Sequence, residues 1–140
     1  MKGIFVKKVK PQYTTVITTL DVWEDNVVQN GTIVAKKGEI KPYQTVVAVG
    51  DNVRCVKEGD FVIINLINYV KRNFEEDSLK EGMNNMQEEK VFDVPQVAIG
   101  DKIYAKLAER DIEYVILDYE EIELETASAN SDALDNNNLL

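Results

Sequence analysis

The chain contains few residues with which enzymes carry out catalysis. It has no histidine, which excludes Ser-His-Asp and Cys-His mechanisms and the commonest ligand of zinc. Its one cysteine, Cys55, permits no disulfide within the chain. A nucleophilic cysteine needs an activating neighbour, and we interpret Cys55 instead as a structural or half-exposed thiol. The sequence therefore offers no candidate for nucleophilic catalysis.

Acidic clusters are the other residues that could support chemistry. Glu75-Glu76-Asp77 and Glu88-Glu89 could in principle act as paired carboxylates or as metal ligands. A calcium-binding loop needs oxygen ligands at a regular spacing, and residues 73–90 lack that spacing. We interpret this stretch as a solvated charged loop. No glycine-rich phosphate loop is present either, so we predict no catalytic residue, no metal site, no cofactor and no enzymatic activity.

Size and charge narrow the class of protein further. The chain has 140 residues, which indicates one domain, with 25 acidic against 16 basic residues and a formal net charge of -9. An excess of acid argues against non-specific binding to nucleic acid and against docking on anionic membranes. There is no apolar run of roughly 18 residues and no signal-peptide pattern at the N-terminus. With its single cysteine, the chain is expected to be cytoplasmic.

The stretch from Thr45 to Asn65 is the strongest structural signal. Val46–Val49 and Phe61–Ile64 are short apolar runs bounded by Gly50-Asp51 and Gly59-Asp60. Such runs, rich in β-branched and aromatic residues, predict strands buried on both faces. Glycine in these turns would supply a backbone position with positive φ, and the aspartate can bond to nearby backbone.

The rest of the chain shows the same pattern of short strands and frequent turns. Residues 4–6 could form an edge strand or a loose N-terminal segment. Further strands are predicted at 12–20, 32–35, 66–72, 91–97, 102–107 and 113–117. With no convincing long helix, this pattern predicts an all-β barrel or sandwich. From Thr126 onward the small, polar, asparagine-rich composition predicts a disordered tail.

One apolar tripeptide lies in a polar, glycine-punctuated stretch. Asn30-Gly31 is a strong hairpin signal, and Ile33-Val34-Ala35 follows it closely. Two interpretations of the tripeptide are open: it is a short strand that pairs with a neighbour, or it is an anchor for a partner carried on a loop.

The order of these motifs resembles the GroES-type co-chaperonin family. That family has an early Arg/Lys-Pro, a mobile loop with an apolar tripeptide, a Gly-x-Val-x-Ala-Val-Gly strand and a Val-x-x-Gly-Asp-x-Val segment. The matching residues here are Lys10-Pro11, Ile33-Val34-Ala35, Val46–Gly50, Val56–Ile64 and, more weakly, Glu113–Leu117 and Tyr119–Ile122. The resemblance implies a small GroES-like β-barrel over residues 1–125, with residues 126–140 as the tail.

The chain also departs from the family pattern. Gln44 occupies the place of the leading glycine, the 50–56 connection is too short for a full roof hairpin, and Lys36-Lys37 replace small residues in the loop. Residues 72–111 have no counterpart in the family and are predicted to be an insertion. Such divergence resembles virus-encoded co-chaperonins.

Two functional hypotheses follow from the resemblance. In the first, the protein is an oligomeric lid, a heptamer if the family pattern holds, whose Ile33, Val34 and Ala35 bind a chaperonin ring that hydrolyses ATP. In the second, the same fold is a structural β-barrel of a virion, as a decoration or assembly protein. The first predicts co-sedimentation with a chaperonin ring in the presence of ATP.

Overall fold

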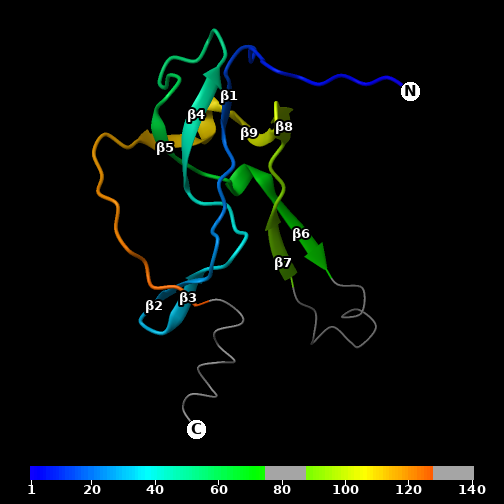
Figure 1. Ribbon diagram of the computed structural model, residues 1–140. Helices are drawn as coiled ribbons and strands as arrows, with labels where there is room; N and C mark the ends of the chain where they lie inside the picture. The colour runs from blue at the N-terminus through cyan, green and yellow to red at the C-terminus, as the bar shows by residue number, and fades with distance from the viewer. Residues whose placement is uncertain (75–87, 128–140) are drawn as a thin grey trace.

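The computed structural model describes residues 1–74 and 88–127, and over these the chain is almost entirely β-structure (Figure 1). The described residues form ten strands, and their only helical elements are the short 3-10 turns Ile67–Tyr69 and Glu109–Asp111. The predicted all-β fold class is confirmed. No helix in the described part of the chain is long and apolar enough to cross a membrane.

Six strands form the main sheet, in the order β10-β5-β4-β1-β9-β8, with every pairing antiparallel. Their bounds are β1 Thr15–Thr19, β4 Tyr43–Val49, β5 Phe61–Ile64, β8 Gln96–Ile99, β9 Lys102–Ala108 and β10 Ile112–Val115. The outer strands β8 and β10 do not pair with each other, so the sheet is not closed into the barrel that the sequence predicted.

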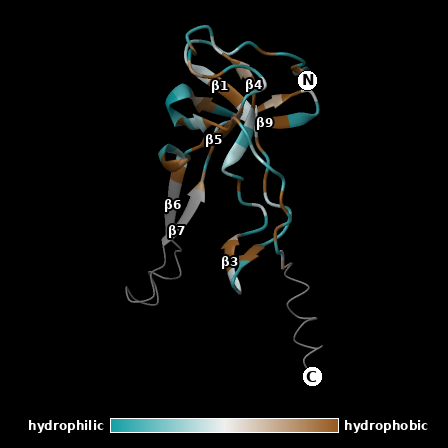
Figure 2. Ribbon diagram, turned by 90° about the vertical axis from the view of Figure 1, so that its left-hand side faces the viewer, coloured by the Kyte–Doolittle hydropathy of each residue, from teal (hydrophilic) through white to brown (hydrophobic). Residues whose placement is uncertain are grey.

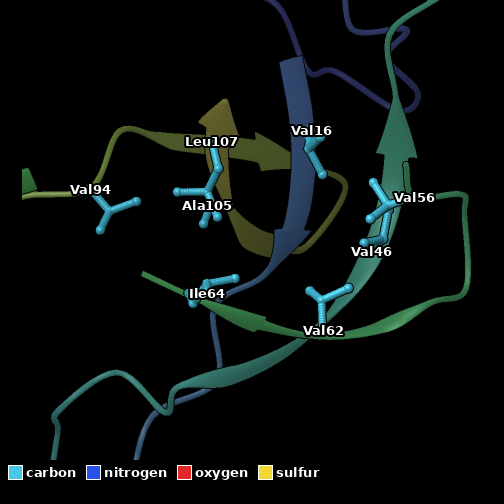
Figure 3. Close-up of a cluster of buried hydrophobic side chains, with 8 residues drawn as sticks. All are labelled: Val16, Val46, Val56, Val62, Ile64, Val94, Ala105 and Leu107. Atoms are coloured by element: carbon cyan, nitrogen blue, oxygen red, sulfur yellow. The ribbon is translucent and has the colours of Figure 1, made fainter. Parts of the chain in front are cut away.

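The hydrophobic core lies on one face of this curved sheet (Figure 3). It consists of the buried side chains of Val16, Val46, Val56, Val62, Ile64, Val94, Ala105 and Leu107. Burial alternates along β4 and β5, where Val46 and Val62 are buried while Val47 and Ile63 are half-buried. The predicted burial of these strands on both faces is therefore wrong. The sheet has one interior face, as is usual in antiparallel sheets.

Two turns beside the core require glycine, each for a different physical reason. Gly59 has φ +95°, the positive value that the sequence predicts, and the adjacent Asp60 carboxylate accepts a hydrogen bond of 2.9 Å from the Lys57 N–H. Gly50 does not have positive φ. A Cβ on Gly50 would lie 2.2 Å from the carbonyl oxygen of Tyr13, so this position needs glycine because two backbone segments approach closely.

Two hairpins extend from the same end of the main sheet (Figures 1 and 2). One is formed by β2, Val27–Gln29, and β3, Thr32–Ala35; the other by β6, Val70–Phe74, and β7, Glu88–Phe92. The second hairpin joins the sheet through a buried carboxylate. Asp111 accepts hydrogen bonds from the Tyr69 hydroxyl at 2.6 Å, the Asn68 side-chain amide at 2.9 Å and the Ala108 N–H at 3.1 Å.

The predicted insertion, residues 72–111, contributes to both parts of the fold. It contains most of the β6–β7 hairpin, but also β8 and β9, and β9 pairs with β1 near the centre of the main sheet. Residues 75–87 lie outside the described part of the chain. That the segment is an insertion relative to a family stays a prediction, while the structure makes its second half an integral part of the sheet.

Both ends of the chain leave the main sheet. Residues 1–10 form an extended segment without strand structure, held by a hydrogen bond of 2.7 Å from the Gly100 N–H to the Val6 carbonyl and by an ion pair of 3.1 Å between Lys10 and Asp51. At the other end, residues 116–127, which we call the C-terminal segment, run from β10 to the β2–β3 hairpin (Figure 1). The predicted tail begins within this segment, and its residues 128–140 lie outside the described part of the chain.

Candidate partner-binding arm

The apolar tripeptide lies on an arm made of residues 21–41. Backbone hydrogen bonds join the two stems of the arm: Lys41 N–H to Asp21 O at 3.0 Å, Trp23 N–H to Glu39 O at 2.9 Å and Gly38 N–H to Trp23 O at 2.8 Å. Beyond the stems, β2 and β3 pair with Val28 opposite Ile33 and Gln29 opposite Thr32. The arm is therefore a continuous paired structure rather than an unstructured loop.

A two-residue turn closes the end of the arm. Asn30 and Gly31 have φ values of 54° and 79°. Positive φ at both central residues is the geometry of a type I′ turn, whose twist matches that of the flanking strands. The Asn30-Gly31 pair in the sequence predicts this hairpin, and the structure confirms it.

Ile33 and Val34 are both exposed near the end of the arm. Their relative exposures are 45% and 56%, and Ala35 is half-buried. All three belong to β3, which Figure 2 places far from the core of the main sheet. The register shifts between Val27 and Val28, so Val34 lies as an extra, unpaired residue between Ile33 and Ala35, as in a β-bulge. The first interpretation, a short strand that pairs with a neighbour, is confirmed, and the second, an anchor for a partner, stays a prediction.

An open cavity of about 540 Å³ lies between the arm and the C-terminal segment. Its apolar lining includes Trp23, Val27, Val34, Ile40 and Leu124. Acidic residues also line it, because Glu123 and Glu125 of the C-terminal segment border the cavity together with Glu39 of the arm. One side chain of the tripeptide, Val34, therefore lines a partly apolar cavity that the described residues leave open.

Gln44 fixes the base of the arm to the main sheet. Its side chain is fully buried, and its amide nitrogen donates to the carbonyls of Asp21 and Lys41, each at 2.9 Å. Its amide oxygen accepts from the Thr19 hydroxyl at 2.8 Å and from the Asp21 N–H at 2.9 Å. A buried amide that makes all four bonds is favourable, whereas the same amide without partners would be costly. Gln44 thus holds both stems at one point.

Aromatic contacts continue from the arm into the sheet. The Trp23 ring meets Tyr43 edge-on at 5.9 Å between centroids, Tyr43 meets Phe61 at 5.5 Å, and Phe61 meets Tyr119 at 5.1 Å. The Lys41 ammonium lies 5.1 Å from the centroid of Trp23. Such pairs add about 0.5–1.5 kcal/mol each beyond their buried area. They connect one stem of the arm, the sheet and the C-terminal segment.

Sequence reasoning missed Gln44 as a functional position and the C-terminal segment as a neighbour of the arm. In the sequence, Gln44 stands out only as a replacement for a glycine of the family pattern. The more informative signal is a glutamine that directly precedes a run of β-branched residues. No local sequence pattern predicts that the C-terminal segment pairs with the arm. The paired residues, such as Val28 and Glu125, are nearly a hundred positions apart, and neither stretch alone encodes the contact.

Outside the arm, the residues that could take part in catalysis or metal binding lie apart from one another. The described residues contain no group of three or more His, Cys, Asp or Glu side chains that could hold a metal ion. Cys55 is exposed, and its N–H donates to the Glu109 carboxylate at 2.9 Å. Burial, together with the hydrogen bond to Asp111 and the charge of that carboxylate, raises the pKa of Tyr69 to about 12. The tyrosine therefore stays protonated at neutral pH and serves as a hydrogen-bond donor.

Comparison with known proteins adds no assignment. A scan of the sequence against models of protein families finds no match. A search of curated proteins finds no significant match.

Proposed function

We propose that the protein is a co-chaperonin: an oligomeric lid that binds a chaperonin ring through Ile33, Val34 and Ala35 and assists ATP-dependent protein folding in the cytoplasm. The observation that carries this proposal is the exposure of Ile33 and Val34, 45% and 56%, on an arm that extends away from the core. Two large aliphatic side chains exposed next to each other near the end of the arm favour a binding role.

The free energy available to one arm is small. Fully burying an Ile or Val side chain contributes roughly 1.5–3 kcal/mol. Because only about half of the surface of each side chain is exposed and can still be buried, docking one arm would gain only about 1.5–3 kcal/mol for the pair. Association loses about 4–15 kcal/mol in translational and rotational freedom, so a single arm cannot hold a partner. Several arms on one oligomer can, because each later contact is intramolecular.

The two ends of the chain support self-association. The N-terminal segment is basic and presents exposed Ile4 and Phe5, with Lys2, Lys7, Lys8 and Lys10 around them. The C-terminal segment is acidic and presents exposed Leu117 and Ile122 among Asp118, Glu120, Glu121, Glu123 and Glu125. Opposite charge and exposed apolar side chains on two extended segments favour pairing between copies. A closed ring, of seven copies if the family resemblance holds, would present its arms together.

The proposal is tested by co-sedimentation with a purified chaperonin ring in the presence of ATP. The unmodified protein is expected to sediment with the ring, and Ile33→Ser combined with Val34→Ser is expected to abolish co-sedimentation. Both side chains are exposed and outside the core, so the variant should keep its fold, which circular dichroism would verify. Negative-stain electron microscopy of the free protein is expected to show rings.

A matched control uses the same chemical change elsewhere. Ile103 is 51% exposed on β9 of the main sheet, and Ile67 is exposed in the 3-10 turn before β6. Ile103→Ser and Ile67→Ser are expected to leave co-sedimentation unchanged. Binding that survives the Ile33 and Val34 changes would remove the role of the tripeptide. Absence of ATP-dependent binding by the unmodified protein, together with monomers in the micrographs, would contradict the proposal as a whole.

A further inference from the structure

The C-terminal segment completes the arm as a third strand. The Val28 N–H donates to the Glu125 carbonyl at 2.8 Å, and the Ala127 N–H donates to the Asn26 carbonyl at 3.0 Å. Between these bonds Val27 and Thr126 form an antiparallel bridge. Strand β2 is therefore paired on both edges, with β3 on one side and residues 125–127 on the other.

The same segment is held at its other end by the main sheet. The Ile116 N–H donates to the Phe61 carbonyl at 2.7 Å, and the ring of Tyr119 lies 5.1 Å from that of Phe61. The segment thus spans from the sheet to the arm, a path that Figure 1 shows. It provides a second connection between them, in addition to the stems fixed by Gln44.

This connection leaves the tripeptide accessible. The hydrogen bonds go to β2, so the outer edge of β3 has no strand beside it in the described part of the chain. Ile33 and Val34 keep their exposure while the segment is in place. Leu124 instead lines the cavity beside Val34. The arrangement supports the arm without covering its apolar side chains.

Pairing with the C-terminal segment should stabilise the arm and thereby affect how strongly the arm binds a partner. An isolated two-stranded hairpin is at best marginally stable, and a third strand is what makes a small sheet persist. Strands β2 and β3 have only three and four residues. Without the third strand, the arm would lose order in the free protein, and a partner would have to restore that order when it binds, at a cost in free energy.

We infer that Glu125 and Ala127 are positioning residues for partner binding, because their backbone hydrogen bonds to Val28 and Asn26 hold the arm in its docking conformation before a partner arrives. This inference rests on the proposed function of the tripeptide. In an oligomer the effect acts on every arm, so a modest loss per arm becomes a large loss of avidity. Glu125 and Ala127 are then part of the binding apparatus although they need not touch the partner.

Two proline substitutions at neighbouring positions separate this role from general disruption. Ala127→Pro removes the N–H that donates to Asn26. Thr126→Pro is the matched control, because neither of the two hydrogen bonds between the segment and the arm uses the Thr126 N–H. The order of the free arm is measured by hydrogen exchange of the Val28 amide and by the fluorescence of Trp23, the only tryptophan of the chain. Affinity is measured by titration of a chaperonin ring with ATP present.

Ala127→Pro is expected to accelerate exchange at Val28, to change Trp23 emission and to weaken binding of the oligomer by about tenfold or more. Thr126→Pro is expected to behave as the unmodified protein. If Ala127→Pro loosens the arm and binding is unchanged or tighter, the inference is overturned, and tighter binding would make the segment a restraint. If the unmodified protein itself does not bind the ring, the proposed function fails, and the inference fails with it. The titration of the unmodified protein distinguishes these two failures.

Discussion

The main sheet and the arm are built from similar β-branched residues, but they are stabilised differently. In the sheet, Val16, Val46, Val62 and Leu107 are buried against one another. In β2 and β3 only Val27 is buried, and the arm is held by backbone pairing, by Gln44 and by the C-terminal segment. Apolar composition alone therefore does not identify a core. The same residue types are buried in the main sheet and largely exposed on β2 and β3.

The largest effect is expected from a change within the main sheet. Leu107 is buried in the core beside β1, and Leu107→Ala would remove its contacts and leave a cavity. The free energy of unfolding is expected to fall by about 2–5 kcal/mol. Urea denaturation followed by circular dichroism measures this. Ile103→Ala on the same strand is the control, because Ile103 is exposed and should change stability by no more than about 0.5 kcal/mol. Equal losses in both variants would contradict the assignment of the core.

An intermediate effect is expected where the arm joins the sheet. Gln44→Ala would leave the Asp21 N–H and the carbonyls of Asp21 and Lys41 without their partner. A buried group without a partner costs about 1–3 kcal/mol, and we expect a total loss of about 2–3 kcal/mol because part of the arm can rearrange toward water. Trp23 fluorescence during urea denaturation is expected to change before the circular dichroism of the sheet.

The control for this change is Gln96→Ala, which removes the same side chain from an exposed position on β8. It should alter stability by no more than about 0.5 kcal/mol. If Gln44→Ala is as mild as Gln96→Ala, the base of the arm does not depend on the buried amide. A single transition by both probes would show instead that arm and sheet unfold as one unit.

The smallest effect is expected where the β6–β7 hairpin joins the main sheet, and this effect depends on pH. Burial and the Asp111 carboxylate raise the pKa of Tyr69 to about 12, against about 10 in an unfolded chain. Between these values the folded protein retains a proton that the unfolded chain releases, so rising pH favours unfolding. The stabilisation from Tyr69 is complete below pH 10 and is lost as the pH approaches about 12.

Tyr69→Phe isolates this contribution. The unmodified protein is expected to be the more stable of the two below pH 10, and the difference should decrease as the pH rises toward 12. Urea denaturation at a series of pH values measures both proteins. Tyr114→Phe changes an exposed tyrosine on β10 and should follow the unmodified protein throughout. A constant difference between the unmodified protein and Tyr69→Phe would contradict the role of this hydroxyl.

The sequence by itself determined the local elements. The β-branched runs at Val46–Val49 and Phe61–Ile64, fenced by Gly-Asp pairs, determine two strands, and Asn30-Gly31 determines the turn at the end of the arm. The physical reason is that strand propensity and positive φ depend on the residue itself and its immediate neighbours. The sequence does not decide whether Ile33 and Val34 are exposed, because a strand can pair through its backbone and still expose its side chains.

Only the tertiary structure decided how distant stretches meet. It placed β9, from the predicted insertion, against β1. It left β8 and β10 unpaired where a barrel was expected, and brought Glu125 and Ala127 to the arm. It also showed that Gly50 is required by the backbone of Tyr13 rather than by its own φ. These contacts depend on which surfaces remain free after the core has packed, and no single stretch of sequence carries that information.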